Sequence, residues 1–446
     1  PGSKWTFGFT IYAKFAGGWT FDGDDPAIYG GRGLYVQHIA YANPAISYKV
    51  NNNLSLGATF QAGQTAMGAN MTMRAPNEIV NITKILGDAT KDMANPLFDV
   101  TIPMPLFGGG IGVYDDIGDV ELRMRDDFSP SYHLGALWEP LDWLSLGLCY
   151  QSALKTTMSG KFSFEYSEDW QRMVSWSGST AIMQIASMIF DLPYTAVEKQ
   201  TGAVSTSMEF PQMINIGLKI KPTRRLSLLG DLKWAEWSIM KDTEIKFDQK
   251  IQLLQMAKFM GYPDGPYTMK MPRKFDDTLD WGFAMTYQLL DWVELRAGYE
   301  HRTSPVQDNL YDLMFDLPSM NYYGTGLGIK WGEMDIDLAL GYMKGKPKKI
   351  PAGYSDNLNS YILGAGLNTS YRGLSYEPKM DVLLVSFNTT VPFEFNTVKF
   401  FVLLPARWGG AKDKIDPKFK LPVDSSVNMI GNMRYENKFY FIEDSV

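Results

Sequence analysis

The chain contains few residues whose types and spacing could support catalysis. It has three histidines, His38, His133 and His301, and a single cysteine, Cys149. These residues form neither a zinc-binding motif nor a cysteine pair, so we expect no metal site and no disulfide within the chain. Ser131 lies two residues before His133, but a serine and a histidine at this spacing are common by chance. We therefore expect no enzymatic activity, no metal and no cofactor.

Charged residues that alternate with apolar ones indicate a different kind of chemistry. Glu294, Arg296 and Glu300 occupy even positions of one stretch, whereas Leu295 and Tyr299 occupy odd positions. A period of two places the two sets on opposite faces of a β-strand. We expect the charged set to form a hydrated, mutually compensating cluster in a lumen. The alternative is that this cluster positions the head group of a ligand.

The same alternation recurs in five predicted hairpins, each with a short turn. They lie at residues 45–60, 130–152, 214–234, 281–300 and 323–342. In the second hairpin, Leu146 and Leu148 alternate with small or polar residues, and Trp138 and Trp143 flank the turn. Leucines on one face with tryptophans at the strand ends are typical of a strand that crosses a membrane. A soluble β-sandwich would show the same period, so the period alone leaves both architectures open.

Unequal loop lengths favour the membrane architecture. The hairpin turns contain a few residues, whereas the connections on the other side are long, at 68–128 and 164–204. Outer-membrane barrels have short periplasmic turns and long extracellular loops, while sandwiches distribute their loop lengths more evenly. We predict an all-β, transmembrane antiparallel barrel, with roughly twelve strands up to Phe393 and about fourteen in all.

Composition agrees with a membrane protein that spans as strands. Aromatic residues make up 14% of the 446 residues, which suits aromatic girdles. The mean hydropathy is −0.18, and no apolar run approaches the length of a spanning helix. The net charge of −7 argues against nucleic acid as a partner.

Short helices are predicted inside the long loops, at 77–93, 179–192 and 248–260. The second one is apolar on several faces, and its apolar residues are Ile182, Ile185, Met188, Ile189 and Phe190. An exposed loop helix is normally amphipathic, so this one requires cover. Packing against a neighbouring loop is the commoner explanation, and contact with an apolar ligand is compatible with it.

Several stretches resemble the FadL/TodX family, the long-chain fatty-acid and aromatic-hydrocarbon transporters of Gram-negative outer membranes. They lie at 129–164, 208–220, 292–306 and 341–346, in an order and spacing that match the family over residues 5–393. The resemblance implies a monomeric 14-stranded barrel for passive uptake of hydrophobic small molecules, in contact with outer-membrane lipid and lipopolysaccharide. The family's N-terminal hatch and first two strands have no counterpart in this sequence. Residues 394–446 would form an extension that can supply further strands.

The resemblance also implies where substrate binds and leaves. A groove between the loops 68–128 and 164–204 would capture it, with Ile82, Leu86, Ile182, Ile185, Met188, Ile189 and Phe190 as candidate contacts. A kinked first strand at residues 5–15, bent near Ala16, Gly17 and Gly18, would form a lateral gate. A general diffusion porin or a structural outer-membrane protein is the alternative, and the apolar helix at 179–192 argues against it.

Overall fold

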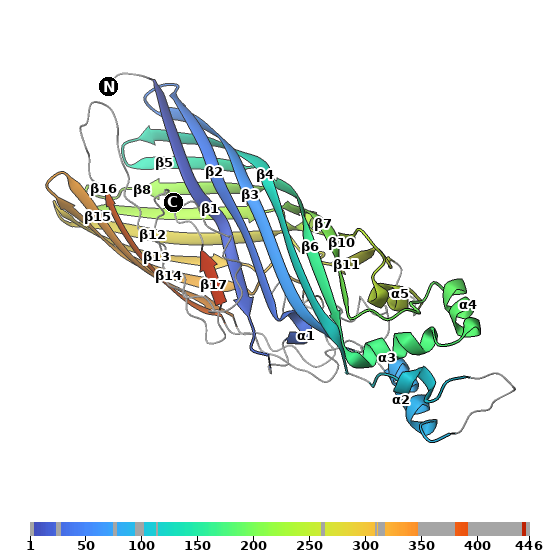
Figure 1. The fold of residues 1–446 in the computed structure, drawn as a ribbon. Coiled ribbons are helices and arrows are strands. Elements are labelled where there is room, and N and C mark those ends of the chain that lie inside the picture. Colours follow the sequence, from blue (N-terminus) through green and yellow to red (C-terminus); the bar gives the residue numbers. More distant parts are fainter. Residues whose placement is uncertain are drawn as a thin grey trace.

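The strands of the protein form a single sheet that curls into an elongated barrel wall. The computed structural model describes residues 4–23, 28–74, 78–93, 102–112, 115–259, 264–307, 310, 317–346, 380–390 and 439–442. All 17 strands of these residues pair antiparallel in one sheet, and most helices gather at one end of the wall (Figure 1). This confirms the predicted all-β architecture. None of the helices in these ranges is both long and apolar enough to cross a membrane.

The sixteen strands from β1 to β16 cross the wall in twelve rows. The number is smaller because, in four of the rows, a break divides one crossing of the wall into two consecutive strands. The rows of one strand are β1 Trp5–Thr20, β2 Gly33–Lys49, β3 Leu54–Arg74, β4 Asp116–Leu141, β13 Val293–Arg302, β14 Met320–Trp331, β15 Met334–Gly345 and β16 Asp381–Thr390. The rows of two strands are β5 Leu144–Gln151 with β6 Leu154–Tyr166, β7 Lys199–Phe210 with β8 Met213–Ile220, β9 Leu226–Ala235 with β10 Asp242–Phe247, and β11 Thr268–Pro272 with β12 Thr278–Leu290. Beyond Phe393, the described residues contain β17 Phe439–Ile442, which pairs with β1, and the rest of the predicted extension at 394–446 lies outside them.

All five predicted hairpins are confirmed as paired strands. They correspond to β2–β3, β4–β5, β8–β9, β12–β13 and β14–β15. Their apolar side chains point out of the barrel, so that Leu56, Leu148 and Leu340 each keep nearly half of their surface exposed. Trp138 and Trp143 are equally exposed beside the β4–β5 turn. This half of the wall therefore presents an apolar outer surface, as a lipid-facing barrel does.

A belt of bulges and strand breaks crosses the wall at mid-height. Bulges occur at Lys14 in β1, at Tyr41 in β2 and at residues 127–128 in β4. Breaks occur at 152–153, 211–212, 236–241 and 273–277. Side chains bind the backbone groups that the belt leaves unpaired, as buried backbone groups require. The Asn43 amide donates to two such carbonyl oxygens, each at 3.0 Å.

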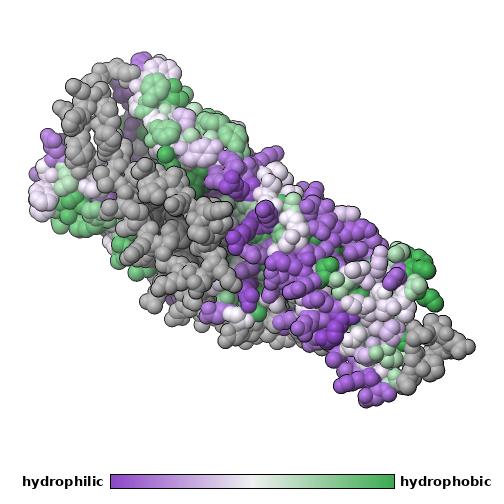
Figure 2. Space-filling view, in the orientation of Figure 1, coloured by the Kyte–Doolittle hydropathy of each residue, from purple (hydrophilic) through white to green (hydrophobic). Residues whose placement is uncertain are grey.

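Apolar residues change faces at this belt. Leu148 of β5 faces outward and is half exposed, whereas Met158 and Phe162 of β6, also at even positions, are buried inside the barrel. The break at 152–153 thus reverses the faces while the alternation in the sequence continues. On the side of the belt away from the helices, which we call the lower wall, the outer surface is apolar (Figure 2). Between the belt and the helices, in the upper wall, the outer surface is polar and surrounds an apolar core.

Short helices lie in the connections on the long-loop side and, for η2, in the strand break at 236–241. These are α1 Ile28–Gly31, α2 Glu78–Ala89, η1 Leu106–Gly109, α3 Glu168–Ser177, α4 Ala181–Ile189, η2 Trp237–Ile239 and α5 Gln252–Phe259. The three predicted helices are present, slightly shorter than expected, and α3 was not predicted. The predicted loop limits were wrong, because β3, β4, β6 and β7 continue between the belt and the helices, with methionines inside and polar or charged side chains outside.

Candidate functional site

Helix α4 stands at the tip of the helical end and is held there by its caps and by α3. The hydroxyl of Ser167 caps α3 by accepting from Trp170 N–H, and the hydroxyl of Thr180 caps α4 in the same way. Helix α3 in turn packs on η1, where the rings of Phe107 and Trp176 lie 4.7 Å apart. The helix α4 is therefore anchored at its N-terminus to a packed unit.

The apolar face of α4 points away from the protein. Its five predicted contact residues keep more than half of their surface exposed, up to 73% for Ile189, and Figure 2 shows apolar surface at this tip. The residue of α4 that is buried is Ser187, whose hydroxyl donates to the carbonyl oxygen of Ser177 at 3.2 Å. The expectation that a neighbouring loop covers this face is wrong for most of it. A face of this kind is typical of a binding surface.

The C-terminal end of α4 is joined to the loop of α5. The rings of Phe190 and Phe259 lie 5.8 Å apart, and Asp191 Oδ1 lies 2.6 Å from Lys250 Nζ. This hydrogen bond from the Lys250 ammonium holds the pKa of Asp191 below its usual value. Asp191 also ends the helix in a left-handed conformation with φ 54°, and Leu192 N–H donates to the carbonyl oxygen of Ser187.

The predicted contacts on α2 are also exposed, but they are not part of the same face. Ile82 and Leu86 lie on α2, which packs on η1 where Gly87 approaches the Gly109 backbone too closely for a side chain. Helices α2 and α4 are linked through η1 and α3 (Figure 1). The structure therefore places the two predicted sets on separate helices, connected by this packed unit.

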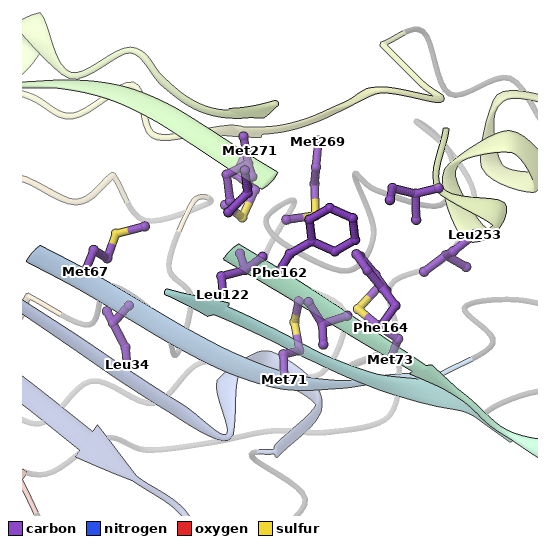
Figure 3. Packing of buried hydrophobic residues seen from close by; sticks show 14 of the residues in the cluster. Leu34, Met67, Met71, Met73, Leu122, Phe162, Phe164, Leu253, Met269 and Met271 are labelled. Carbon is purple, nitrogen blue, oxygen red and sulfur yellow. The ribbon is translucent and has the colours of Figure 1, made fainter. Parts of the chain in front are cut away.

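Below the helices, the barrel interior is apolar and rich in methionine. Figure 3 shows Met67, Met71, Met73, Met269 and Met271 converging with Phe162 and Phe164. The residues come from β3, β6 and β11, and Leu122 of β4 and Leu253 of α5 join them. A cavity of about 10 Å³ lies among them, enough for a single water molecule. A ligand could enter this closed interior only if side chains move, and methionine side chains adapt readily.

The predicted lumen charges divide into two groups. Arg296 donates to Glu294 and to Asp337, each at 2.7 Å, whereas Glu300 pairs with Arg302 at 2.8 Å. The structure thus places Glu294 and Arg296 together and assigns Glu300 a different partner.

Two of the remaining chemical candidates, Ser131 and His301, are engaged in structural hydrogen bonds. Ser131 donates to Gln61 at 2.8 Å rather than to His133, and His301 hydrogen-bonds Asn321. In the part of the chain that the structure describes, no group of three or more His, Cys, Asp or Glu side chains could hold a metal ion.

Ala16, Gly17 and Gly18 continue β1 in unbroken register with β2. The irregularities of β1 lie earlier, between Thr10 and Tyr12 and between Ala13 and Phe15. The predicted bend at 16–18 is thus displaced to the belt. Gly18 instead allows β1 to lie close to β2, because a Cβ there would lie 2.7 Å from the Leu34 carbonyl oxygen.

Comparison with known proteins identifies the architecture. A Pseudomonas aeruginosa FadL homologue has a similar fold, with a TM-score of 0.58 at 18% identity over 81% of this chain and 70% of that chain. The Ralstonia pickettii toluene transporter TbuX matches with a TM-score of 0.50 at 15% identity over 78% of this chain and 74% of its own. A Neisseria meningitidis serogroup B protein, described provisionally as an outer membrane protein, is 25% identical over 205 residues. That match spans 46% of this chain and 39% of the relative's length.

A family model covers almost the whole wall. The model of outer membrane protein transport proteins, described as OMPP1/FadL/TodX, matches residues 2–393. The match agrees with the antiparallel barrel, the lipid-facing hairpins and the long helical loops described above. It also assigns the chain to a family of transport proteins rather than of enzymes. The chain belongs to the OMPP1/FadL/TodX family of outer-membrane β-barrel transport proteins.

Proposed function

We propose that this protein takes up hydrophobic small molecules passively by capturing them on the exposed face of α4. The observation that carries the proposal is the arrangement of apolar surfaces. An apolar helix face stands at the tip of a polar shell, and that shell encloses an apolar interior. An apolar solute would gain about 25 cal/mol for each Å² of surface removed from water at either place.

Helix α5 supplies the connection between the two apolar regions. Its Phe259 contacts Phe190 of α4, and its Leu253 and Leu254 are fully buried in the methionine-rich interior. A molecule that leaves α4 therefore meets apolar side chains of one helix on the way inward. The unbranched methionines around Met269 can then rearrange to make room for it.

Release through the wall near the belt is the step that completes the route. The bulge at Lys14 interrupts the register of β1, and below it Phe7 and Phe9 present half or more of their surface to the lipid side. Bulges bend strands and stop regular pairing, so they suit an opening in a barrel wall. Sideways release would deliver an apolar molecule into lipid without exposing it to water.

An open pore fits the structure less well. The rings of Phe15 on β1 and Phe210 on β7 lie 4.5 Å apart. Because β1 and β7 are not neighbours in the sheet, this contact crosses the lumen. Aromatic side chains that meet across a lumen obstruct the water-filled passage that a porin requires.

The test compares hydrophobic uptake with ion conductance. Purified protein would be titrated with dodecanoate and with toluene, followed by tryptophan fluorescence, and then inserted into planar bilayers for conductance measurements. Saturable binding of either compound with little steady conductance is the expected result. Steady conductance without binding of either compound would replace the proposal with a porin.

A further inference from the structure

The outer surface of the wall has a hollow at the belt, which we call the belt pocket. Its volume is about 470 Å³, within the range of ordinary ligand pockets. It opens outward, since two of its aromatic residues, Phe60 and Tyr132, keep 50% and 46% of their surface exposed. The lining residues used in the argument are Phe60, Tyr132, Tyr150, Ala153, Lys155 and Gln212.

The belt pocket exists because strands break in neighbouring rows at the same height. One break, at 152–153, separates β5 from β6, and another, at 211–212, separates β7 from β8. Leu154 is fully buried, so the chain turns inward directly after the first break. The small side chains of Ser152 and Ala153 line the hollow that this turn leaves on the outside.

Hydrogen bonds close the wall behind the belt pocket. The Ser152 N–H donates to the carbonyl oxygen of Tyr132 at 2.9 Å, and the Tyr132 N–H donates to the Ser152 hydroxyl at 3.0 Å. At the rim, the Tyr150 hydroxyl donates to Gln212 at 2.7 Å, and the Gln212 amide donates to Glu236 at 2.6 Å. An occupant therefore reaches the pocket from the membrane side and not from the lumen.

The side of the belt pocket that faces the lower wall is aromatic. Phe60 and Tyr132 are register partners in β3 and β4, and the rings of Tyr132 and Tyr150 lie 6.0 Å apart. A row of aromatic side chains between an apolar and a polar outer surface marks the level of the membrane–water interface. The pocket is therefore at the height where lipid head groups meet acyl chains.

The side that faces the upper wall carries a positive charge. Among the described residues that line the pocket, Lys155 is the charged one, and its side chain is 78% exposed. Its Nζ lies 3.2 Å from Glu209 Oε1. An ammonium group has three N–H donors, so this pair leaves donors for a second acceptor.

We propose that the belt pocket binds a phosphorylated glycolipid of the outer leaflet, of the lipid A type. A phosphate would accept from Lys155, in a charge-assisted hydrogen bond, while an acyl chain lies along Tyr132 and the lower wall. The polar outer surface of the upper wall continues above the pocket, which fits a head group that extends into sugars rather than a small phospholipid head. This site is separate from the route proposed for hydrophobic substrates, and the inference does not depend on that route.

The test separates the phosphate from the rest of the lipid. Diphosphoryl lipid A, the same lipid without its phosphates, and phosphatidylglycerol would be titrated into the protein in a nonionic detergent, and bound lipid counted by native mass spectrometry. The variants are Lys155→Gln, which removes the charge, and Ala153→Phe, which places a ring in the pocket. Lys246→Gln is the matched control, because Lys246 is also exposed and also lies 3.2 Å from a carboxylate, that of Glu244.

Lys155→Gln is expected to weaken binding of diphosphoryl lipid A roughly three- to tenfold, less than a buried charge would because Lys155 is largely solvated. Binding of the phosphate-free lipid should not change, and Lys246→Gln should bind both lipids as wild type does. Ala153→Phe should abolish saturable binding of both, and if it fails to fold, Lys155→Gln still decides.

Three results would overturn the inference. They are a wild type that does not bind diphosphoryl lipid A saturably, an unchanged affinity for that lipid in Lys155→Gln, and equally tight binding of phosphatidylglycerol and lipid A by wild type. The last result would assign the belt pocket to phospholipids. Toluene binding should be the same in every folded variant, so a failure here leaves the proposed function standing.

Discussion

Replacing two exposed residues of α4 with glutamine tests the capture surface directly. In Ile185→Gln with Met188→Gln, both positions keep a helix-compatible side chain and lose their apolar surface. Each residue is 58% exposed, so neither change removes a core contact. We expect the melting temperature to be preserved and ligand affinity to fall.

The magnitude follows from the exposed area. Full burial of an isoleucine or methionine side chain contributes about 1.5–3 kcal/mol, and a bound ligand would cover about half of the exposed part. The pair therefore contributes about 1–2 kcal/mol, which corresponds to a roughly 5- to 30-fold change in Kd. Burying two unpaired amides adds to the loss.

The assay is fluorescence titration with dodecanoate, followed by uptake in cells that carry each variant. Ile82→Gln with Ile85→Gln on α2 is the matched comparison, because these residues are similarly exposed, at 51% and 57%. Of these two helices, α4 is the one that the described contacts join through α5 to the interior, so the α2 variant should have the smaller effect. Equal affinity of the α4 variant and wild type, with both folded, would refute the assignment of the capture surface.

Three further changes examine other parts of the route. Lys250 lowers the pKa of Asp191, so the contact between them is complete above the ordinary aspartate pKa and is lost only as pH falls through the lower pKa of the folded protein. Ligand binding should therefore stay constant from pH 8 to pH 5 and weaken only below about pH 4. A decline near neutral pH would contradict this. Arg296→Gln should lower stability by less than about 1 kcal/mol in chemical denaturation, because the ion pairs are partly solvated, and leave uptake intact; lost uptake would indicate a role in binding the head group. Met269→Leu with Met271→Leu should lower the free energy of unfolding by less than about 1.5 kcal/mol for each substitution. It should slow the uptake of bulky ligands more than that of linear ones, because leucine adapts less readily than methionine. An equal reduction of uptake for both classes of ligand would count against an adaptable passage.

Local patterns in the sequence predict the lower wall well. The five hairpins were found because each combines a short turn with strict alternation, and both signals depend on neighbours along the chain. The apolar residues of α4, such as Ile189, were also recognisable by composition. Their exposure was not, because whether a helix face is covered depends on segments far away in the sequence.

The upper wall was harder to recognise. Strand β4 carries charges such as Arg123 outward and Met124 inward, a mixture that looks like a polar loop until the methionines are recognised as core. Helix α3 had a signal that was overlooked: Ser167 precedes acidic residues, and Trp170, Met173 and Val174 recur at helical spacing.

The proximity of Lys14 to the imidazoles of His38 and His133 could not be predicted from the sequence. Lys14, His38 and His133 belong to three different strands, and the bulge that turns Lys14 inward depends on the pairing of β1 with β2. No local pattern distinguishes such a lysine from a solvated one. Burial in the folded wall is what gives it chemical significance.

The belt also determines how far the protein stands out from the cell. Strand β4 continues from the belt near Asp126 back to Asp116, and at about 3.4 Å per residue this is a length of about 34 Å. A strand tilt of about 40° converts that length to a height of about 26 Å. Helix α4 lies beyond the end of this strand and is thus carried well away from the lipid-facing part of the wall (Figure 1). Under the proposed function, an apolar molecule is collected at this height, and the part of the barrel between α4 and the belt is the passage that leads it to the lipid-facing wall.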